Sequence, residues 1–506
     1  MLPRRKSAAF LVLFALPVLG LYAQADPREA WYGFGSPQVL SESSVIAGSQ
    51  WDDPAVRSFG EVMRSGFTAW VYAVLKNTLT MYFNGVVIRS TWAFPTPETI
   101  QRAFSEPWKW EDTDGFMVNH LGHPIQGSVY FNAARVNGFG FYGSLFFSAL
   151  GSAMWEAVHE RQRPSINDFL VTTPTGMSLG EMTFRLYAQA LAAGVPTFLA
   201  ALFNPAAGVH HLITGWEPLQ TENNIYDSRF FVSAAFGHTD HTVSDANGPR
   251  EMFRHSGPFA DFGFGIVYGD PFTQGTWVPF RHFEFHASFG MDAVFQNHYR
   301  LFSDGYLFSF SPLHTEAQAL SHGLSLFYDF ASLGALDMYY ASINMYSNAL
   351  GWTVKYRHLF PRNVALRSRA HAAFTFLGAS SYYNPDRGRA LLNYGYGFSL
   401  RHLSTLDLGR RIRLDLHNFA YFLWHYPGTA SNAATFMPPE TTSISEGFVW
   451  WQFHDLTFSY LLTERISLGA TLSFATERGS FGAFPSTSVN HWAVRTFVAW
   501  NGQNIR

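Results

Sequence analysis

The chain has 506 residues and a nearly balanced charge, with 34 Lys and Arg against 37 Asp and Glu. This balance argues against a nucleic-acid partner, which needs a basic surface. The lack of cysteine excludes disulfides, thiolate metal sites, thiol nucleophiles and lipid attachment through a lipoprotein cysteine. Only 14% of the residues are charged, against about 25% in a soluble globular domain.

The N-terminus has the pattern of a secretory signal peptide. Three basic residues at positions 4–6 precede an apolar run over 8–20, and the small residues of Ala23-Gln24-Ala25 suit a cleavage site. The run is too short to be a spanning helix. We therefore predict a signal peptide over 1–25, followed by an irregular periplasmic tether over 26–58 that is rich in Gly, Ser and Pro.

Residues 59–222 have helical periodicity and are predicted to form an α-helical plug or periplasmic domain. Helices are expected over 59–83, 97–104, 118–135, 139–160 and 179–192, with breaks at 164–168 and 173–176. Two nearly apolar runs, 141–158 and 186–203, could each be a spanning helix or a buried helix. The polar residues that interrupt them lower the tendency to insert, which favours a buried plug or periplasmic helix.

From residue 223 to the end, apolar residues alternate with polar ones. In 281–290, Phe283, Phe285 and Phe289 share one face and His282 and Glu284 the other, as in a half-buried strand. The last strand, with Trp492 and Trp500 on one face, resembles the aromatic closing strand that barrel-assembly machinery recognises. Thirteen candidate strands have cores near 228–238, 258–268, 280–290, 299–310, 321–332, 336–347, 349–359, 364–376, 390–402, 411–423, 446–461, 464–475 and 491–500.

Bacterial single-chain barrels have even strand numbers, so one of the thirteen candidates must be wrong or merged. The weakest pair spans 337–360, where the alternation slips near Ser342 and indicates a bulge or one long strand. Residues 237–258 and 426–445 are expected to be long outer loops, and 461–464 a short inner turn.

The apolar strand faces must meet either a protein core or lipid. A soluble sandwich needs a charged exterior, which this composition does not supply, whereas a membrane barrel shows apolar residues outward and polar residues inward. We therefore predict a mainly β fold: a transmembrane antiparallel β-barrel of about twelve strands over 223–506, preceded by the helical domain. The expected location is the outer membrane of a Gram-negative bacterium, with membrane lipid and the assembly machinery as partners.

Polar residues on the other strand faces are predicted to point into the lumen. They can form a salt-bridged filling, or they can line a pore or ligand cavity in which arginines favour anions. The predicted lumen-facing residues are His282, Glu284, His286, Arg367, Arg369, His371, Arg411, Arg413, Asp415 and His417.

The helical block also concentrates histidines and carboxylates. Such groups can bind zinc or perform acid–base chemistry, but the spacing matches no defined zinc motif, so neither a metal nor a cofactor is predicted. A network that fixes helix packing, and groups that face lumen arginines, are the other two interpretations. The candidate residues are His120, His123, Glu156, Glu160, Asp168 and Glu181.

The order of residues over about 110–220 resembles a bacterial family of unknown function. The resemblance is carried by Asn119-His120, His123-Pro124, Gly127-Ser128, Gly151-Ser152, Trp155-Glu156, Glu160, Ser165, Asn167-Asp168, Gly176, Leu179-Gly180-Glu181, Asn204-Pro205, Gly208 and Gly215. His210-His211 departs from it, because an Asn–Arg pair is expected there. The resemblance implies an exported helical block joined to an outer-membrane barrel, and it implies no activity.

Three functions remain open from the sequence. The first is a barrel with a channel, transport or envelope-structural role. The second is a barrel enzyme that modifies envelope lipid through the histidine and carboxylate cluster. The third is a polytopic inner-membrane protein, which would fractionate with the cytoplasmic membrane.

Overall fold

The computed structural model describes residues 58–110, 114–218, 224–272, 275–292, 297–335, 343–384, 389–426, 447–481 and 484–502. The predicted signal peptide, and all of the predicted tether except Ser58, lie outside these residues. The chain divides into two compact units. A helical unit comprises residues up to 112 and 122–224, and a barrel unit comprises 113–121 and 225–506.

The helical unit contains helices at each position expected from the periodicity. Ser58 and Glu61 form a capping box at the first helix, and the Asn204 side chain accepts from Ala207 N at the last. Its elements are α3 (Phe59–Tyr82), the π-helix η2 (Phe83–Ile88), α4 (Pro97–Ser105), α5 (His123–Val136), α6 (Phe141–Val158), α7 (Ile166–Ala192), α8 (Thr197–Ala200) and α9 (Pro205–Thr214).

The break predicted at 173–176 is wrong, because α7 continues through Pro174. A Cβ atom on Gly176 would lie only 2.6 Å from Gly127 Cα, so the glycine marks a close crossing of α5 and α7. Tertiary packing here overrides the local signal for a break. Among the described residues, no helix is both long enough and apolar enough to cross a membrane.

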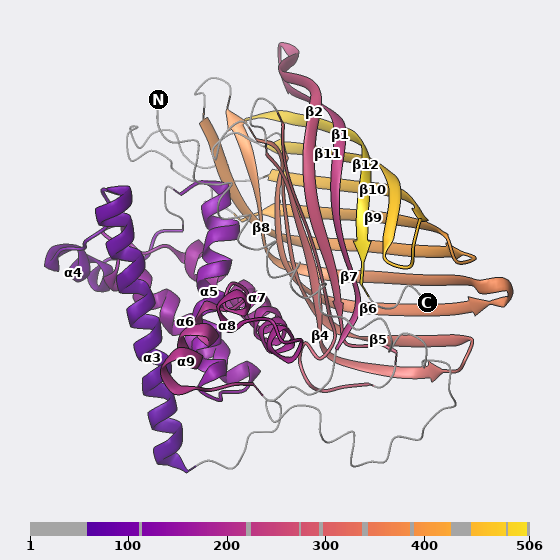
Figure 1. Cartoon of the computed structure of the whole chain (residues 1–506). Coiled ribbons are helices and arrows are strands. Elements are labelled where there is room, and N and C mark those ends of the chain that lie inside the picture. Colours follow the sequence, from indigo (N-terminus) through magenta and orange to yellow (C-terminus); the bar gives the residue numbers. More distant parts are fainter. Residues whose placement is uncertain are drawn as a thin grey trace. The chain divides into compact units, whose positions relative to one another are not determined.

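The second unit is a closed antiparallel barrel of twelve strands, as predicted. Each strand pairs with its sequence neighbours, and β1 closes the ring against β12, with Val232 opposite Val498 (Figure 1). The strands are β1 (Ile225–Asp245), β2 (Gly248–Tyr268), β3 (Phe283–Asp292), β4 (Asn297–His314), β5 (Gln318–Ala335), β6 (Ile343–Phe360), β7 (Val364–Asn384), β8 (Arg389–Leu408), β9 (Ile412–His425), β10 (Gly447–Leu461), β11 (Ile466–Phe481) and β12 (Phe484–Asn501).

Two details of the strand prediction change. The candidates at 336–347 and 349–359 merge into β6, which carries a register shift between Asn348 and Ala349, while 336–342 lie outside the described residues. The loop predicted over 237–258 is wrong, because β1 and β2 extend through it to a tight turn after Asp245. Polar residues on both faces obscure the alternation in this part of the two strands. The strands form nevertheless, because the hydrogen bonds between them join backbone groups and do not depend on the side chains.

The other two connections are partly described. The short turn predicted at 461–464 is confirmed between β10 and β11. Nearly all of the outer loop predicted at 426–445 lies outside the described residues.

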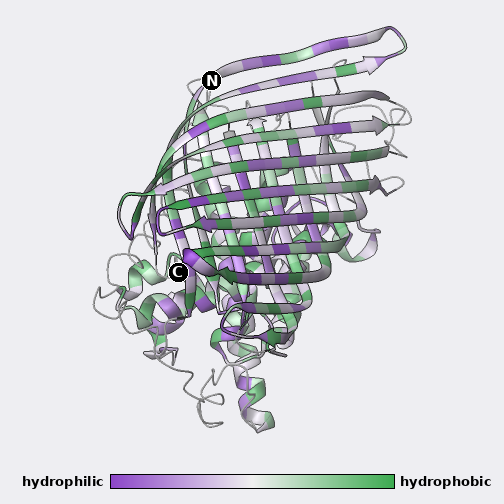
Figure 2. Cartoon of the chain, turned by 90° about the vertical axis from the view of Figure 1, so that its right-hand side faces the viewer, coloured by the Kyte–Doolittle hydropathy of each residue, from purple (hydrophilic) through white to green (hydrophobic). Residues whose placement is uncertain are grey.

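The alternation along each strand separates two faces of the barrel wall (Figure 2). Large apolar side chains on the outward face are open to the surroundings, as with Val498, which is 53% exposed, and with Phe398 and Leu472. Inward positions carry polar and charged side chains that are buried, such as Asp329 and Arg401. A closed ring satisfies the backbone groups of every strand, so the outward face can be wholly apolar.

A short segment of residues 114–121, which includes the π-helix η3 (Val118–Gly122), packs on this outward face. Asp329 points inward, so its neighbours Tyr328 and Phe330 point outward. The Tyr328 hydroxyl donates to the His120 carbonyl at 2.8 Å, and the Phe116 ring stacks on Phe330. The segment therefore belongs to the barrel wall although the sequence places it within the helical block.

Candidate functional site

The barrel interior contains a cavity of about 290 Å³. It lies toward the end at which β1 begins and β12 ends, and every strand except β5 contributes to its lining. Fourteen of the lining side chains are charged: Arg229, Arg300, Lys355, Arg367, Arg369, Arg401, Arg413 and Arg495, with Asp227, Asp261, Glu284, Asp304, Asp415 and Asp455.

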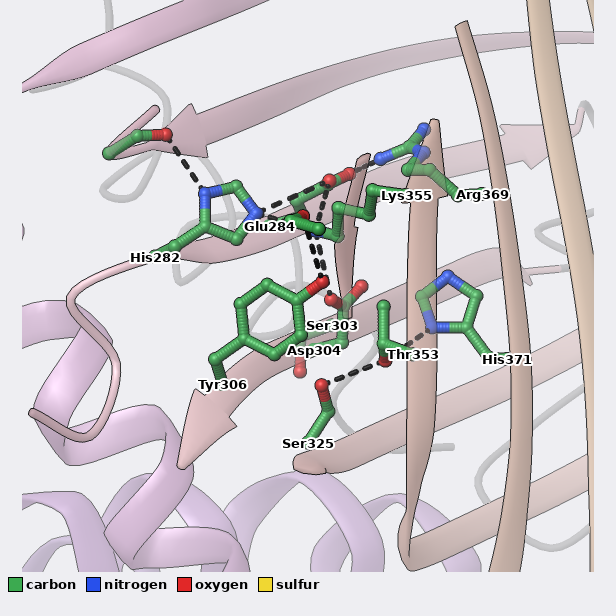
Figure 3. Close-up of polar contacts among 12 residues, drawn as sticks. His282, Glu284, Ser303, Asp304, Tyr306, Ser325, Thr353, Lys355, Arg369 and His371 are labelled. Carbon is green, nitrogen blue, oxygen red and sulfur yellow. Dashed lines mark hydrogen bonds and ion pairs between the residues drawn. The ribbon is translucent and has the colours of Figure 1, made fainter. Parts of the chain in front are cut away.

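Glu284 on β3 is the centre of one buried network beside the cavity (Figure 3). Lys355 Nζ on β6 lies 2.7 Å from Glu284 Oε1, and Arg369 on β7 forms an ion pair with the same carboxylate. Lys355 also approaches Asp304 at 3.5 Å and His282. Because Glu284 and Lys355 are almost completely buried, each charge depends on its partner.

Further ion pairs connect strands that are distant in sequence. Arg300 on β4 donates through Nη1 to both oxygens of Asp455 on β10, at 3.0 and 3.1 Å. Arg401 on β8 donates to Asp329 on β5 at 3.0 Å. Such pairs connect strands that are not neighbours in the sheet.

Two arginines in this wall keep N–H groups that no acceptor among the described residues receives. They are Nε and Nη2 of Arg300 and Nη2 of Arg413, and both side chains are more than nine-tenths buried. A buried donor without an acceptor costs free energy. These nitrogen atoms are themselves buried, so they lie within the packed wall and not on its surface facing the cavity.

An apolar layer fills the interior next to the cavity. Phe302, Phe419, Phe453 and Trp451 belong to one buried cluster with side chains from β5, β6, β11 and β12. Since these residues come from strands around the ring, their side chains meet across the lumen. The barrel interior therefore has a charged part and an apolar part.

The structure places most of the predicted lumen residues in or beside this cavity. Glu284, His286, Arg367, Arg369, Arg413, Asp415 and His417 line it, while His282 and His371 are buried next to it. Arg411 differs, because it lies in the exposed turn before β9 and donates to the Tyr460 hydroxyl.

Several cavity residues are not among the predicted lumen-facing ones, including Arg300, Lys355, Arg401 and Arg495. The alternation could have identified Arg300, which lies between the outward Tyr299 and Leu301. The inward direction of Lys355 could not be inferred in this way, because Lys355 lies in the stretch 337–360, where the alternation slips.

In the helical unit, four of the six histidine and carboxylate candidates lie near the junction of α6 and α7. Glu156 accepts from Ser165 N at 2.8 Å and from Ser165 Oγ at 3.1 Å, and the Ser165 hydroxyl also contacts Asp168. His123 Nε2 is 3.6 Å from Asp168 Oδ1, and Glu160 is buried near the end of α6. This hydrogen bonding ties the start of α7 to the end of α6.

Glu181 forms a separate pair of ion bridges. Arg135 Nε lies 2.8 Å from Glu181 Oε2, and Arg185 Nε lies 2.9 Å from Oε1. One carboxylate between two buried guanidinium groups joins α5 to α7. In this arrangement the three buried charges are paired with one another.

His120 does not join His123, although only two residues separate them. His120 belongs to the barrel unit, where its ring lies 4.6 Å from Tyr346 and 4.4 Å from Phe116. Within the described part of the chain, no group of three His, Asp or Glu side chains is placed to hold a metal ion. The six candidates are therefore dispersed over three different sites.

Comparison with known proteins identifies one family. Residues 107–206 match the family described as Domain of unknown function (DUF3943). The resemblance expected from the sequence is confirmed over these residues. No curated protein matches the sequence.

The comparison with solved structures finds, among others, a transporter and two porins. The toluene transporter TodX of P. putida is 10% identical, with a TM-score of 0.22, over 55% of this chain and 90% of that chain. The NanC porin is 8% identical (TM-score 0.24, 52% and 98%), and the KdgM porin is 9% identical (TM-score 0.21, 53% and 98%). At these values the likeness carries no argument about what this chain does.

Proposed function

We propose that this protein is an outer-membrane β-barrel that binds a small anionic solute in its interior cavity as a step in transport. The observation that carries the proposal is the opposite chemistry of the two wall faces. Outward positions such as Phe398, Leu472 and Val498 are large, apolar and exposed, while ion pairs are buried inside. Lipid is the environment in which this arrangement is stable.

The class of solute follows from the cavity wall. Eight basic side chains, among them Arg300 and Arg413, line the cavity against six acidic ones. Guanidinium groups bind phosphate and carboxylate oxygens well because their donors are planar and permanently charged. The apolar layer containing Phe302 and Phe453 lies beyond the cavity, so passage of a bound anion requires these side chains to move.

Location is tested by fractionation and gel migration. We expect the protein in outer-membrane fractions, where the unboiled protein migrates differently from the boiled protein because a closed barrel resists detergent. Recovery with the cytoplasmic membrane contradicts the proposed location. Identical migration before and after boiling contradicts a stable barrel.

Binding is tested by titrating the purified, folded protein with inorganic phosphate and following the unfolding temperature. Phosphate that binds the folded state raises that temperature. We expect Arg413→Gln to weaken the apparent affinity at least about 10-fold, equivalent to roughly 1.4 kcal/mol. Arg411→Gln is the matched control, because Arg411 is exposed in a turn. Equal affinities in both variants contradict the proposed site.

The alternative of an envelope-lipid enzyme has less support. The Ser165 hydroxyl and Asp168 belong to hydrogen bonds that fix the start of α7. Glu156→Gln distinguishes the two roles. A packing role predicts a lower yield of folded protein, whereas a catalytic role predicts normal folding with loss of a lipid modification.

A further inference from the structure

Helix α3 has large side chains on its free face and small ones on its packed face. Its buried residues are Ala69, Ala73 and Asn77, spaced four apart. On the other side Phe67 is 64% exposed and Leu79 is 60% exposed, with Leu75 between them. A surface helix of a water-soluble domain has the reverse order, with its large apolar residues facing the core.

Helix α6 repeats the pattern only in part, because Phe147 and Trp155 are buried on it together with a row of serines. Ser144, Ser148 and Ser152 lie on its packed face and are buried, while Tyr142 and Phe146 are each more than 60% exposed on the other side. The residues on each face are four apart, so each set forms one row along the helix.

The end of the helical unit adds exposed apolar residues from two more helices. Phe198 on α8 and Leu212 and Ile213 on α9 are exposed, and Leu212 is 80% exposed. The His210 ring on α9 accepts from or donates to the Tyr72 hydroxyl on α3, so these two helices are neighbours. The exposed apolar surface therefore extends over several packed helices.

Close packing through small residues also occurs inside the unit. A Cβ atom on Gly127 would lie 2.0 Å from the Thr172 carbonyl oxygen, and one on Gly180 would lie 2.6 Å from the Phe131 ring. Helices in lipid associate through small residues that let backbones approach, because lipid provides no hydrophobic drive to bury large ones between helices. The glycines at these crossings fit such close approach, while large side chains such as Phe131 and Phe184 are buried in the unit as well.

We propose that the helical unit contacts lipid, with the exposed rows of α3 and α6 embedded among the acyl chains of the bilayer. This inference rests on the proposed function, which places the outward barrel face in lipid. Residues 114–121 pack on that outward face, and α5 begins at His123, two residues after the segment ends. The chain therefore passes within two residues from a segment on the outward barrel face to the start of α5.

Lipid suits these rows better than a second copy of the chain does. Exposed apolar residues on α3 occur on several sides of the helix, including Phe67, Trp70, Leu75 and Leu79. A single protein partner would cover one side of such a helix, whereas acyl chains can contact all of its free sides. Burying such side chains in the acyl region is the usual source of affinity for helices at a bilayer.

The experiment uses the lack of cysteine in the chain, which allows a fluorophore to be attached at one chosen position. The full-length variants Phe67→Cys, Leu75→Cys and Phe146→Cys are labelled with an environment-sensitive dye. They are then reconstituted into phosphatidylethanolamine–phosphatidylglycerol vesicles with or without doxyl-labelled lipid. Leu472→Cys on the outward barrel face is the positive control, and Gln101→Cys, exposed on the polar side of α4, is the negative control.

We expect doxyl lipid to quench the three helix labels by at least about half the loss seen at Leu472, and to leave the Gln101 label nearly unchanged. Quenching at Leu472 without quenching at the helix labels overturns this inference and leaves the proposed function standing. Absence of quenching at Leu472 contradicts the proposed function itself. Unquenched helix labels, together with a disulfide-linked dimer when the unlabelled Phe67→Cys variant is treated with a mild oxidant, would assign the surface to a second copy and overturn the lipid contact. Heat-dependent gel migration verifies that each variant has folded.

Discussion

Glu284 determines the charge balance of its part of the barrel interior, because one carboxylate serves both Lys355 and Arg369. Arg413 and Arg367 share Asp407 in the same way. A buried ion pair contributes little when it is complete, since the loss of hydration offsets the attraction, but removal of one partner leaves an uncompensated charge. At the residue scale, stability therefore depends on keeping each group intact.

This reasoning predicts a large effect of Glu284→Ala. The buried Lys355 and the partly buried Arg369 lose their shared carboxylate, so we expect the free energy of unfolding to fall by about 3–5 kcal/mol. Glu251→Ala is the matched control, because Glu251 pairs with Arg254 at the same 2.7 Å distance but at an exposed site. We expect it to cost less than about 1 kcal/mol. Urea unfolding in lipid vesicles measures the free energy of unfolding of both variants. Similar losses in the two variants would contradict the larger role of the buried Glu284.

The helical unit is predicted to lose stability in mild acid. Burial lowers the pKa of His159 and of His210 from 6.5, so protons bind the unfolded chain before they bind the folded one. The stabilisation is complete above the unfolded value of 6.5 and is lost as the pH falls through 6.5 toward the lower folded values. We expect the denaturation midpoint, followed by circular dichroism at 222 nm, to drop between pH 7.5 and pH 5.5.

The variant that carries both His159→Gln and His210→Gln should show a smaller drop over this range. His314→Gln, on an exposed part of β4, serves as the control and should retain the drop. If the double variant shows the same pH dependence as the unchanged protein, other groups are responsible.

At the scale of elements, the crossing of α5 and α7 is the tightest contact of the helical unit. A Cβ atom on Gly176 would meet backbone atoms of Gly127 at 2.5 and 2.6 Å, which no side-chain movement can relieve. We expect Gly176→Ala to lower the free energy of unfolding by about 1–3 kcal/mol. Gly143→Ala on α6 is the control, because its nearest neighbour is a Phe139 ring atom at 3.5 Å.

Gly143→Ala should leave the stability unchanged or raise it by up to about 1 kcal/mol, since alanine favours the helix. Thermal unfolding followed at 222 nm measures both variants. A neutral Gly176→Ala would show that the two helices are further apart than described.

At the scale of the whole molecule, the two units differ in what holds them together. The barrel closes its hydrogen bonding from β1 to β12 and has no free edge, while the helical unit depends on side-chain packing. We expect the helical signal at 222 nm to be lost at a lower temperature than the heat-dependent gel shift. One coincident transition in both measurements would show that the units unfold together.

Much of the fold could be predicted from the sequence, because the evidence for it is local. A period of two residues fixes which side chains share a face, so the strands and their outward apolar rows follow from the alternation, and the even strand number of bacterial barrels reduces thirteen candidates to twelve. The alternation does not reveal a strand where polar residues occupy both faces, as over 237–258. The prediction also failed where a proline lies within a tightly packed helix, as at Pro174 in α7.

The sequence by itself determined the barrel, its two faces and the presence of a helical block. Only the tertiary structure decided which charges meet, because Arg300 and Asp455 lie 155 positions apart and are joined by strand register and ring closure. It also separated His120 from His123, since one packs on the barrel wall and the other begins α5. Periodicity describes neighbours along the chain, whereas a site is formed by residues that come together only when the sheet closes.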